Sequence, residues 1–137
     1  MSPSHVPCPM FLSIFTGMFQ TIALVFIGGG LGSLARFGVS TGVKQFSDTT
    51  FPLATLLANF LSCLVIGIAL SVFSEKLQDN SIRMFVVVGF CGGFSTFSTF
   101  SLETLEIFRR GQYLLATANI ALSLALCMMV LAFLVKK

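Results

Sequence analysis

The sequence predicts an all-α membrane protein in which four helices cross the bilayer. Of the 137 residues, 55% are hydrophobic and only 9% are charged, whereas soluble domains carry about a quarter charged residues. The apolar residues fall into four runs that are each long enough for a membrane span of about 20 residues. Short polar segments separate these runs, so we expect an antiparallel four-helix bundle in a lipid bilayer.

The predicted spans are residues 19–39, 53–73, 83–101 and 113–135. Pro52 stands where the second helix can begin, because the first turn of a helix tolerates proline. Residues 19–137 therefore form a single transmembrane domain.

Residues 1–18 are expected to be a leader that is disordered or lies at the membrane interface. They include Pro3, Pro7 and Pro9, and they lack both the positive n-region and the small-residue cleavage site of a signal peptide.

The basic residues favour neither orientation in the membrane. One predicted side carries Lys76, Arg83, Lys136 and Lys137, and the other carries Arg36, Lys44, Arg109 and Arg110. The positive-inside rule therefore gives a tie. Either the rule is noisy in so small a protein, or copies insert both ways and meet as an antiparallel, dual-topology homodimer. The scattered basic residues form no patch for nucleic acid.

The first span contains glycines at helical spacing and a charged residue near its end. Gly28 and Gly32 form a Gly-xxx-Gly face, which favours close helix packing over a dinucleotide fingerprint because no strand precedes it. Arg36 either extends to the membrane interface or faces a water-filled vestibule.

The remaining titratable residues exclude several kinds of site. None of the acidic residues lies near a predicted midplane, which argues against a proton-coupled cation exporter. The cysteines show no Cys-x-x-Cys spacing, so we expect neither a zinc site nor a structural disulfide. The single histidine, His5, lies in the leader and offers no base for an enzyme.

Asn59 is a lone amide in the apolar second span. Because an unpaired amide in lipid costs several kcal/mol, it must face protein, water or a permeating species. Asn119 and Ser123 in the fourth span are four residues apart and share a helix face. They are equally consistent with helix–helix hydrogen bonds and with a polar track.

The third span is the most informative. Gly92 and Gly93 at mid-span weaken a helix and predict a break there. A repeat then follows, in which Phe94, Phe97 and Phe100 alternate with serine and threonine. A spacing of three would place the phenylalanines in a helical band about 120° wide.

This repeat is unusual for a lipid-facing surface and suggests a pathway for an anion. Ring edges carry partial positive charge, and the hydroxyls of Thr96, Ser98 and Thr99 can donate hydrogen bonds, as can the amide of Asn59. No lysine or arginine lies at mid-span, so dipoles would hold a small, strongly accepting anion weakly enough to let it leave. Alternatively, the rings only pack a bundle core.

The chain resembles the CrcB/Fluc family of fluoride channels from about residue 19 to its C-terminus. The resemblance rests on Gly-Gly-Gly-Leu-Gly-Ser-Leu-Ala-Arg in the first span, Thr-Leu-Leu-Ala-Asn in the second and residues 89–101 in the third. It implies a passive fluoride channel of the bacterial inner membrane, built as an antiparallel homodimer with two pores. It also implies that Asn59, Phe97, Phe100 and Ser123 line the pore.

The resemblance further implies a structural sodium ion at the dimer centre, held by backbone carbonyls of Gly92 and Ser95. The family usually has threonine at the position of Ser95 and glycine at the position of Ser62. Two other interpretations remain, namely a small multidrug exporter and a membrane protein with a purely structural role.

Overall fold

The computed structural model describes residues 9–46, 49, 51–72, 77 and 79–135, and its regular elements in this part of the chain are all helical. The first, second and fourth spans are the single helices α1 (Pro9–Phe46), α2 (Leu53–Val72) and α6 (Tyr113–Leu134). The third span is composite and consists of α3 (Asn80–Arg83), the π-helix η2 (Met84–Cys91), α4 (Gly92–Phe94) and α5 (Phe97–Arg109). In the described residues, four helical stretches are long and apolar enough to cross a membrane.

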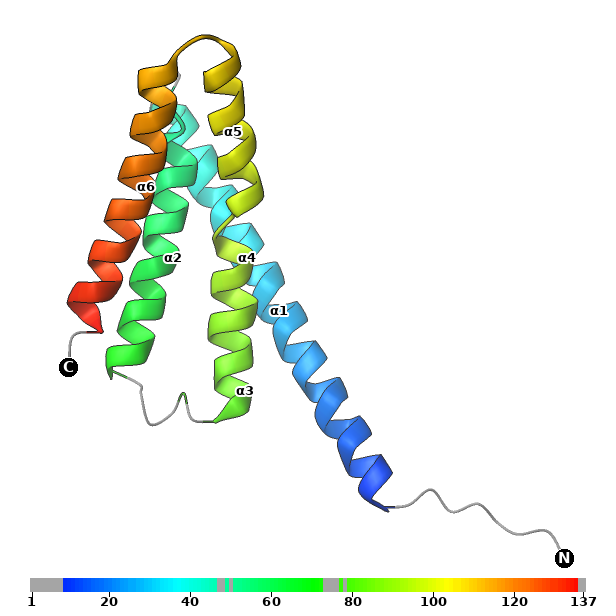
Figure 1. Cartoon of the computed structure of the whole chain (residues 1–137). Coiled ribbons are helices and arrows are strands. Elements are labelled where there is room, and N and C mark those ends of the chain that lie inside the picture. The colour runs from blue at the N-terminus through cyan, green and yellow to red at the C-terminus, as the bar shows by residue number, and fades with distance from the viewer. Residues whose placement is uncertain (1–8, 47–48, 50, 73–76, 78, 136–137) are drawn as a thin grey trace, which may run out of the picture.

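The helices pack in two pairs (Figure 1). α2 lies alongside α6, while η2 and α4 lie against α1. α5 continues the third span and turns tightly into α6 at Gly111, whose φ of 76° lies in the left-handed region that glycine adopts without strain. The N-terminal part of α1 extends away from the other helices.

α1 is longer than the span that the sequence predicts. It begins at Pro9, so residues 9–18 of the expected leader are helical. Residues 1–8 lie outside the described part of the chain.

Glycines bring α1 into backbone contact with the third span. A Cβ added to Gly28 would lie 2.5 Å from the Phe85 carbonyl oxygen, and one added to Gly89 would lie 3.0 Å from the Gly28 Cα. A Cβ on Gly32 would overlap the Phe90 carbonyl oxygen, and one on Gly93 would overlap the Gly29 carbonyl oxygen. Only glycine allows this approach, and close packing is what holds helices together in lipid.

The third span breaks at Ser95 and Thr96, so the prediction of a break at Gly92-Gly93 is wrong. Both glycines are helical, and the backbone becomes extended only at Ser95 (φ −75°, ψ 154°) and Thr96 (φ −148°, ψ 105°). The physical reason is that Gly93 serves close packing against α1 instead of breaking the helix. The break therefore lies two residues further along, where α5 starts with its own cap.

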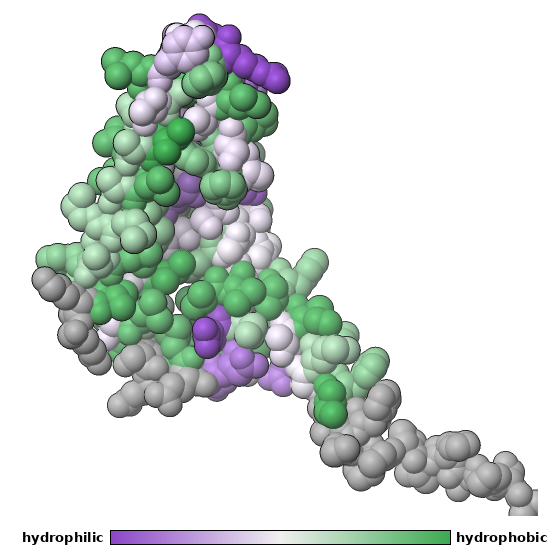
Figure 2. Space-filling model, in the orientation of Figure 1, coloured by the Kyte–Doolittle hydropathy of each residue, from purple (hydrophilic) through white to green (hydrophobic). Residues whose placement is uncertain are grey.

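The surface suits a lipid solvent. Large apolar side chains are exposed along every span, including Phe26 at 80% and Phe133 at 81%. Figure 2 shows apolar residues over most of the visible face, with hydrophilic residues gathered near its upper and lower ends. The buried interior is small and partly polar, with Ser62 and Asn119 each only 1% exposed. Polar groups are thus turned inward, the reverse of a soluble bundle.

We predict that Gly32→Ala destabilises the protein, because the new methyl group would overlap the Phe90 carbonyl oxygen and force α1 away from η2. Overpacking of this kind costs about 1–3 kcal/mol, which should lower the midpoint of thermal unfolding in detergent. Gly30→Ala is the matched control, since a Cβ there meets nothing within 4 Å. Equal midpoints for the two variants would contradict the packing role of Gly32.

Candidate functional site

A hydrogen bond between α2 and the third span lies at the break. The Thr96 backbone N–H donates to Asn59 Oδ1 at 2.9 Å. In a continuous helix this N–H would donate to the Gly92 carbonyl, four residues earlier. Asn59 therefore replaces a backbone acceptor that the break removes. With its Oδ1 engaged, the Nδ2 group is the part of the Asn59 side chain that can donate elsewhere.

Thr96 also organises the start of α5. Its Oγ1 accepts from the Thr99 N–H at 3.3 Å, which is the N-cap bond of the helix. The same hydroxyl lies 3.0 Å from Thr99 Oγ1 and 3.3 Å from Ser98 Oγ. The three hydroxyl residues that the sequence singles out thus form one connected group at the break.

A pocket of about 200 Å³ lies on one side of the break, between α2, α5 and α6. We call it the phenylalanine pocket; it is lined by Asn59, Cys63, Ser95, Phe97, Phe100, Ser123, Leu124 and Cys127. The Phe97 and Phe100 rings have centroids 6.0 Å apart and are tilted by 42°. Phe97 is 80% exposed on this single chain. Four of the predicted pore residues are thus brought together here: Asn59, Phe97, Phe100 and Ser123.

Phe94 does not share the face of these rings, so the prediction of a common band for all three phenylalanines is wrong. Phe94 is only 5% exposed and packs against Phe90, with ring centroids 5.7 Å apart. The helical spacing argument fails because the chain leaves the helix at Ser95 and Thr96, between Phe94 and Phe97.

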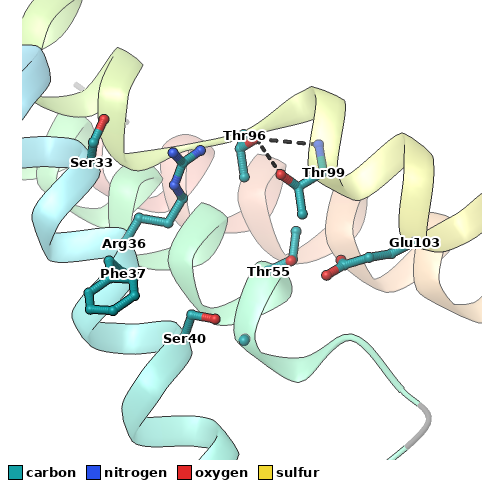
Figure 3. A pocket seen from close by; sticks show the side chains of 9 residues that line it. Ser33, Arg36, Phe37, Ser40, Thr55, Thr96, Thr99 and Glu103 are labelled. Carbon is teal, nitrogen blue, oxygen red and sulfur yellow. Dashed lines mark hydrogen bonds between the residues drawn. The ribbon is translucent and has the colours of Figure 1, made fainter.

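A second pocket, of about 240 Å³, lies between α1, α2 and α5. We call it the arginine pocket; it is lined by Ser33, Arg36, Phe37, Ser40, Ala54, Thr55, Thr96, Thr99 and Glu103. In Figure 3 the Arg36 guanidinium reaches from α1 toward Thr96, and Glu103 extends from α5 toward Thr55. Arg36 thus lines a polar hollow, as its vestibule interpretation requires.

Glu103 contributes the negative charge of the arginine pocket. Its Oε2 is buried and accepts no hydrogen bond from any described residue. Glu103 is only partly buried as a residue, and Arg36 lines the same pocket. The pocket therefore holds one positive and one negative side chain without a direct ion pair among the described residues.

Asn119 and Ser123 of α6 differ in their surroundings. Asn119 Nδ2 donates to Thr104 Oγ1 at 2.8 Å and so links α6 to α5. Ser123 lines the phenylalanine pocket, and its buried Oγ has no hydrogen-bond partner among the described residues. Of the two, Ser123 is therefore the one placed to bind a species in the pocket.

The break also changes the bonding of backbone carbonyls, including those of Gly92 and Ser95. The donors that would meet Gly92 and Ser95 in a continuous helix are the N–H groups of Thr96 and Thr99. These donate instead to Asn59 Oδ1 and Thr96 Oγ1. The Ser95 hydroxyl donates to the Cys91 carbonyl at 3.0 Å and so remains close to its own helix. The Gly92 and Ser95 carbonyls thus lack the donors that a continuous helix would give them.

Sequence reasoning missed several residues of the two pockets. Thr55 lies one helical turn before Asn59 and lines the arginine pocket, whereas Cys63 lies one turn after it and lines the phenylalanine pocket. The i±4 spacing from Asn59 is the signal that could have identified both. The Asn119–Thr104 bond had no such signal, because it depends on how α5 and α6 are rotated toward each other.

The fold and these pockets identify the chain as a multi-pass membrane protein. Four apolar spans enclose a polar pocket on one side of a break in the third span and a largely apolar pocket with a few polar groups on the other, as in a multi-pass membrane protein. Residues 23–134 match the family described as CrcB-like protein, Camphor Resistance (CrcB). The chain belongs to this family, and it is a multi-pass membrane protein of the bacterial inner membrane type.

Curated relatives carry the same name across distant organisms. A protein of Serratia proteamaculans (strain 568), named fluoride-specific ion channel FluC, is 40% identical over 119 residues, which are 85% of this chain and 93% of the relative. The protein of that name from Pyrococcus abyssi (strain GE5 / Orsay) is 44% identical over 102 residues, covering 74% of this chain and 81% of the relative. One from Coxiella burnetii (strain CbuK_Q154) is 38% identical, with coverage of 79% and 89%. Their name is that of a channel family, not of an enzyme.

Proposed function

We propose that this protein is a passive, fluoride-selective channel. The observation that carries the proposal is the Asn59–Thr96 bond, because it joins a lining residue of one pocket to a lining residue of the other across the break. Asn59 lines the phenylalanine pocket and Thr96 lines the arginine pocket, and the two residues are 2.9 Å apart at this bond. In the proposed pathway, an anion would pass from one pocket to the other beside this bond. The relatives named as fluoride channels support the choice of anion.

The donors along this path match the needs of fluoride. Arg36 attracts an anion into the arginine pocket, where the hydroxyls of Thr96 and Thr99 can replace water. The phenylalanine pocket then offers the Asn59 amide, the unpartnered Ser123 hydroxyl and the edges of two rings. None of its lining residues is charged, so fluoride is bound by dipoles alone and can leave again.

The direction of flow follows from the electrochemical gradient. The negative interior of a cell drives anions outward, by about 2.3 kcal/mol per elementary charge for each 100 mV. Fluoride that enters as HF loses its proton at neutral pH and is trapped as the anion. A passive channel therefore exports it and protects the cytoplasm from fluoride toxicity, with no coupled proton or nucleotide.

Two copies are needed to complete the pathway. The Phe97 ring, 80% exposed here, leaves the phenylalanine pocket open on one side. An antiparallel homodimer would close the pocket and is compatible with the equal numbers of basic residues on the two sides of the membrane. Each dimer would then contain two such pathways.

A sodium ion at the dimer centre would use the carbonyls that the break releases. The Gly92 and Ser95 carbonyls lack their helical donors, and one pair from each copy gives four oxygens, which suits a hard cation. The side chain of Ser95 is not required, because its hydroxyl is bonded to Cys91. Serine can therefore replace the family's usual threonine.

The proposal is tested by fluoride efflux from liposomes that contain the purified protein, read with a fluoride electrode beside a chloride control. Rapid fluoride efflux with little chloride movement is expected. Folded, dimeric protein that releases no fluoride would overturn the channel assignment and leave a structural role.

We predict that Phe97→Ile and Phe100→Ile each reduce fluoride efflux by about tenfold or more, which corresponds to about 1.4 kcal/mol of lost stabilisation. An aliphatic side chain keeps the apolar volume but has no positive ring edge. Phe133→Ile is the matched control, since Phe133 is 81% exposed and lines neither pocket. Parent-level efflux in both pocket variants would remove the rings from the pathway.

We predict that Asn59→Asp folds normally and conducts about tenfold less fluoride or worse, since a hydrogen bond to an anion is worth about 1.5–3 kcal/mol. Aspartate keeps the acceptor for the Thr96 N–H but replaces the Nδ2 donor with a charge that repels fluoride. Asn59→Leu removes both functions and should also lower the unfolding temperature. If the aspartate variant conducts like the parent, the amide is not a fluoride ligand.

We predict that efflux is slow in liposomes prepared with an organic cation in place of sodium, and that added sodium restores it. Ser95→Ala should keep this dependence, because the variant retains the backbone carbonyl. Fluoride efflux that is indifferent to sodium in both proteins would argue against the central cation.

A further inference from the structure

Two cysteines line the phenylalanine pocket and have no part in the fluoride pathway as described. Cys63 is on α2, one turn after Asn59, and Cys127 is on α6, one turn after Ser123. Both are free thiols and only partly buried, whereas the free thiol of Cys91 is 1% exposed. The pocket therefore gives access to both of its thiols.

The two thiols lie on neighbouring helices. α2 and α6 pack side by side (Figure 1), and Cys63 and Cys127 line the same pocket from these two helices. In the described residues, no group of three or more His, Cys, Asp or Glu side chains could hold a metal ion. The sulfur ligands that the pocket lining offers are the thiols of Cys63 and Cys127.

We propose that Cys63 and Cys127 form a two-coordinate site for a soft, thiophilic, divalent d¹⁰ cation, mercury(II), and that filling it blocks the phenylalanine pocket. Thiolate sulfur selects such ions over the hard cations that prefer oxygen. The proposal rests on the proposed function only for the block, because metal binding itself requires nothing of fluoride.

The reaction with mercuric chloride is balanced without any oxidant. Each thiol gives up its proton, two S–Hg bonds form, two Hg–Cl bonds break, and two HCl leave. The product, S–Hg–S, carries no net charge. A neutral complex suits a pocket whose lining residues are uncharged, since an isolated charge would be costly there.

The block follows from the position of the sulfurs. Cys63 and Cys127 share the 200 Å³ pocket with Asn59, Phe97 and Phe100. A metal ion bridging the sulfurs fixes α2 to α6 at this level and occupies space beside the rings. Fluoride would then lose both space and hydrogen-bond donors in the phenylalanine pocket.

The test uses the full chain with Cys8→Ser and Cys91→Ala, so that only the pair remains. After treatment with mercuric chloride, intact mass spectrometry should show one mercury per chain with two hydrogens lost. The adduct should survive a dilute glutathione wash. Removal of either remaining cysteine, by Cys63→Ser or Cys127→Ser, should yield an adduct that the wash strips. Two mercury atoms per chain, or none, would overturn the paired site.

Fluoride efflux from liposomes provides the second readout. Mercuric chloride should abolish most efflux in the protein that retains the pair, dithiothreitol should restore it, and the Cys63→Ser/Cys127→Ser double variant should resist the inhibition. Mercury bound as one atom per pair with undiminished efflux would overturn the block. An untreated protein that releases no fluoride would overturn the channel itself, while the mass measurement still decides the metal site.

If Cys8→Ser and Cys91→Ala together prevent folding, the natural chain is used instead. It is compared with its own Cys63→Ser/Cys127→Ser variant, and the difference between the two should be one wash-resistant mercury per chain. Equal amounts of retained mercury in the two proteins would overturn the paired site.

Discussion

The hydrogen bond from the Thr96 N–H to Asn59 Oδ1 is the interaction on which the polar interior depends. In hydrocarbon, a backbone N–H that leaves its helix must find another acceptor, or the break costs several kcal/mol. Asn59 supplies that acceptor from a neighbouring helix. The break then directs Thr96 and Thr99 into one pocket and Phe97 and Phe100 into the other. It also withdraws the helical donors from the Gly92 and Ser95 carbonyls.

The glycine contacts determine where α1 meets this break. Because lipid provides no hydrophobic drive for helices to associate, the contact relies on dispersion forces between closely packed backbones. Gly28 and Gly32 of α1 face Phe85 and Phe90 of η2 with no room for a side chain. Arg36 lies one turn beyond Gly32 and is thereby brought to the level of Thr96 (Figure 3). The close packing of these glycines thus positions the positive charge of Arg36, which the proposed pathway uses.

The same glycines explain what could and could not be predicted from the sequence. The four spans follow from apolar length alone, and the small-residue face of α1 follows from spacing. A break predicted at Gly92-Gly93 lies too early, because glycine in a membrane helix can either weaken the helix or allow close packing. Gly93 allows close packing. For the same reason, the predicted band that joins Phe94 to Phe97 and Phe100 is wrong. Contacts between helices, such as Asn119 with Thr104, depend on helix rotation, which no local pattern of residues encodes.

The phenylalanine pocket is suited to weak binding because its lining carries no full charge. A lysine or arginine there would hold fluoride too long, and a carboxylate would exclude it. Dipoles from Asn59, Ser123 and two ring edges avoid both outcomes. The same neutrality leaves thiols as the strongest metal-binding groups in the pocket, and these discriminate against hard cations. Sodium would therefore be confined to backbone oxygens at the break, while only soft ions could bind between Cys63 and Cys127. Separate ligand chemistries would let one small interior keep the proposed anion path and the two proposed cation sites apart.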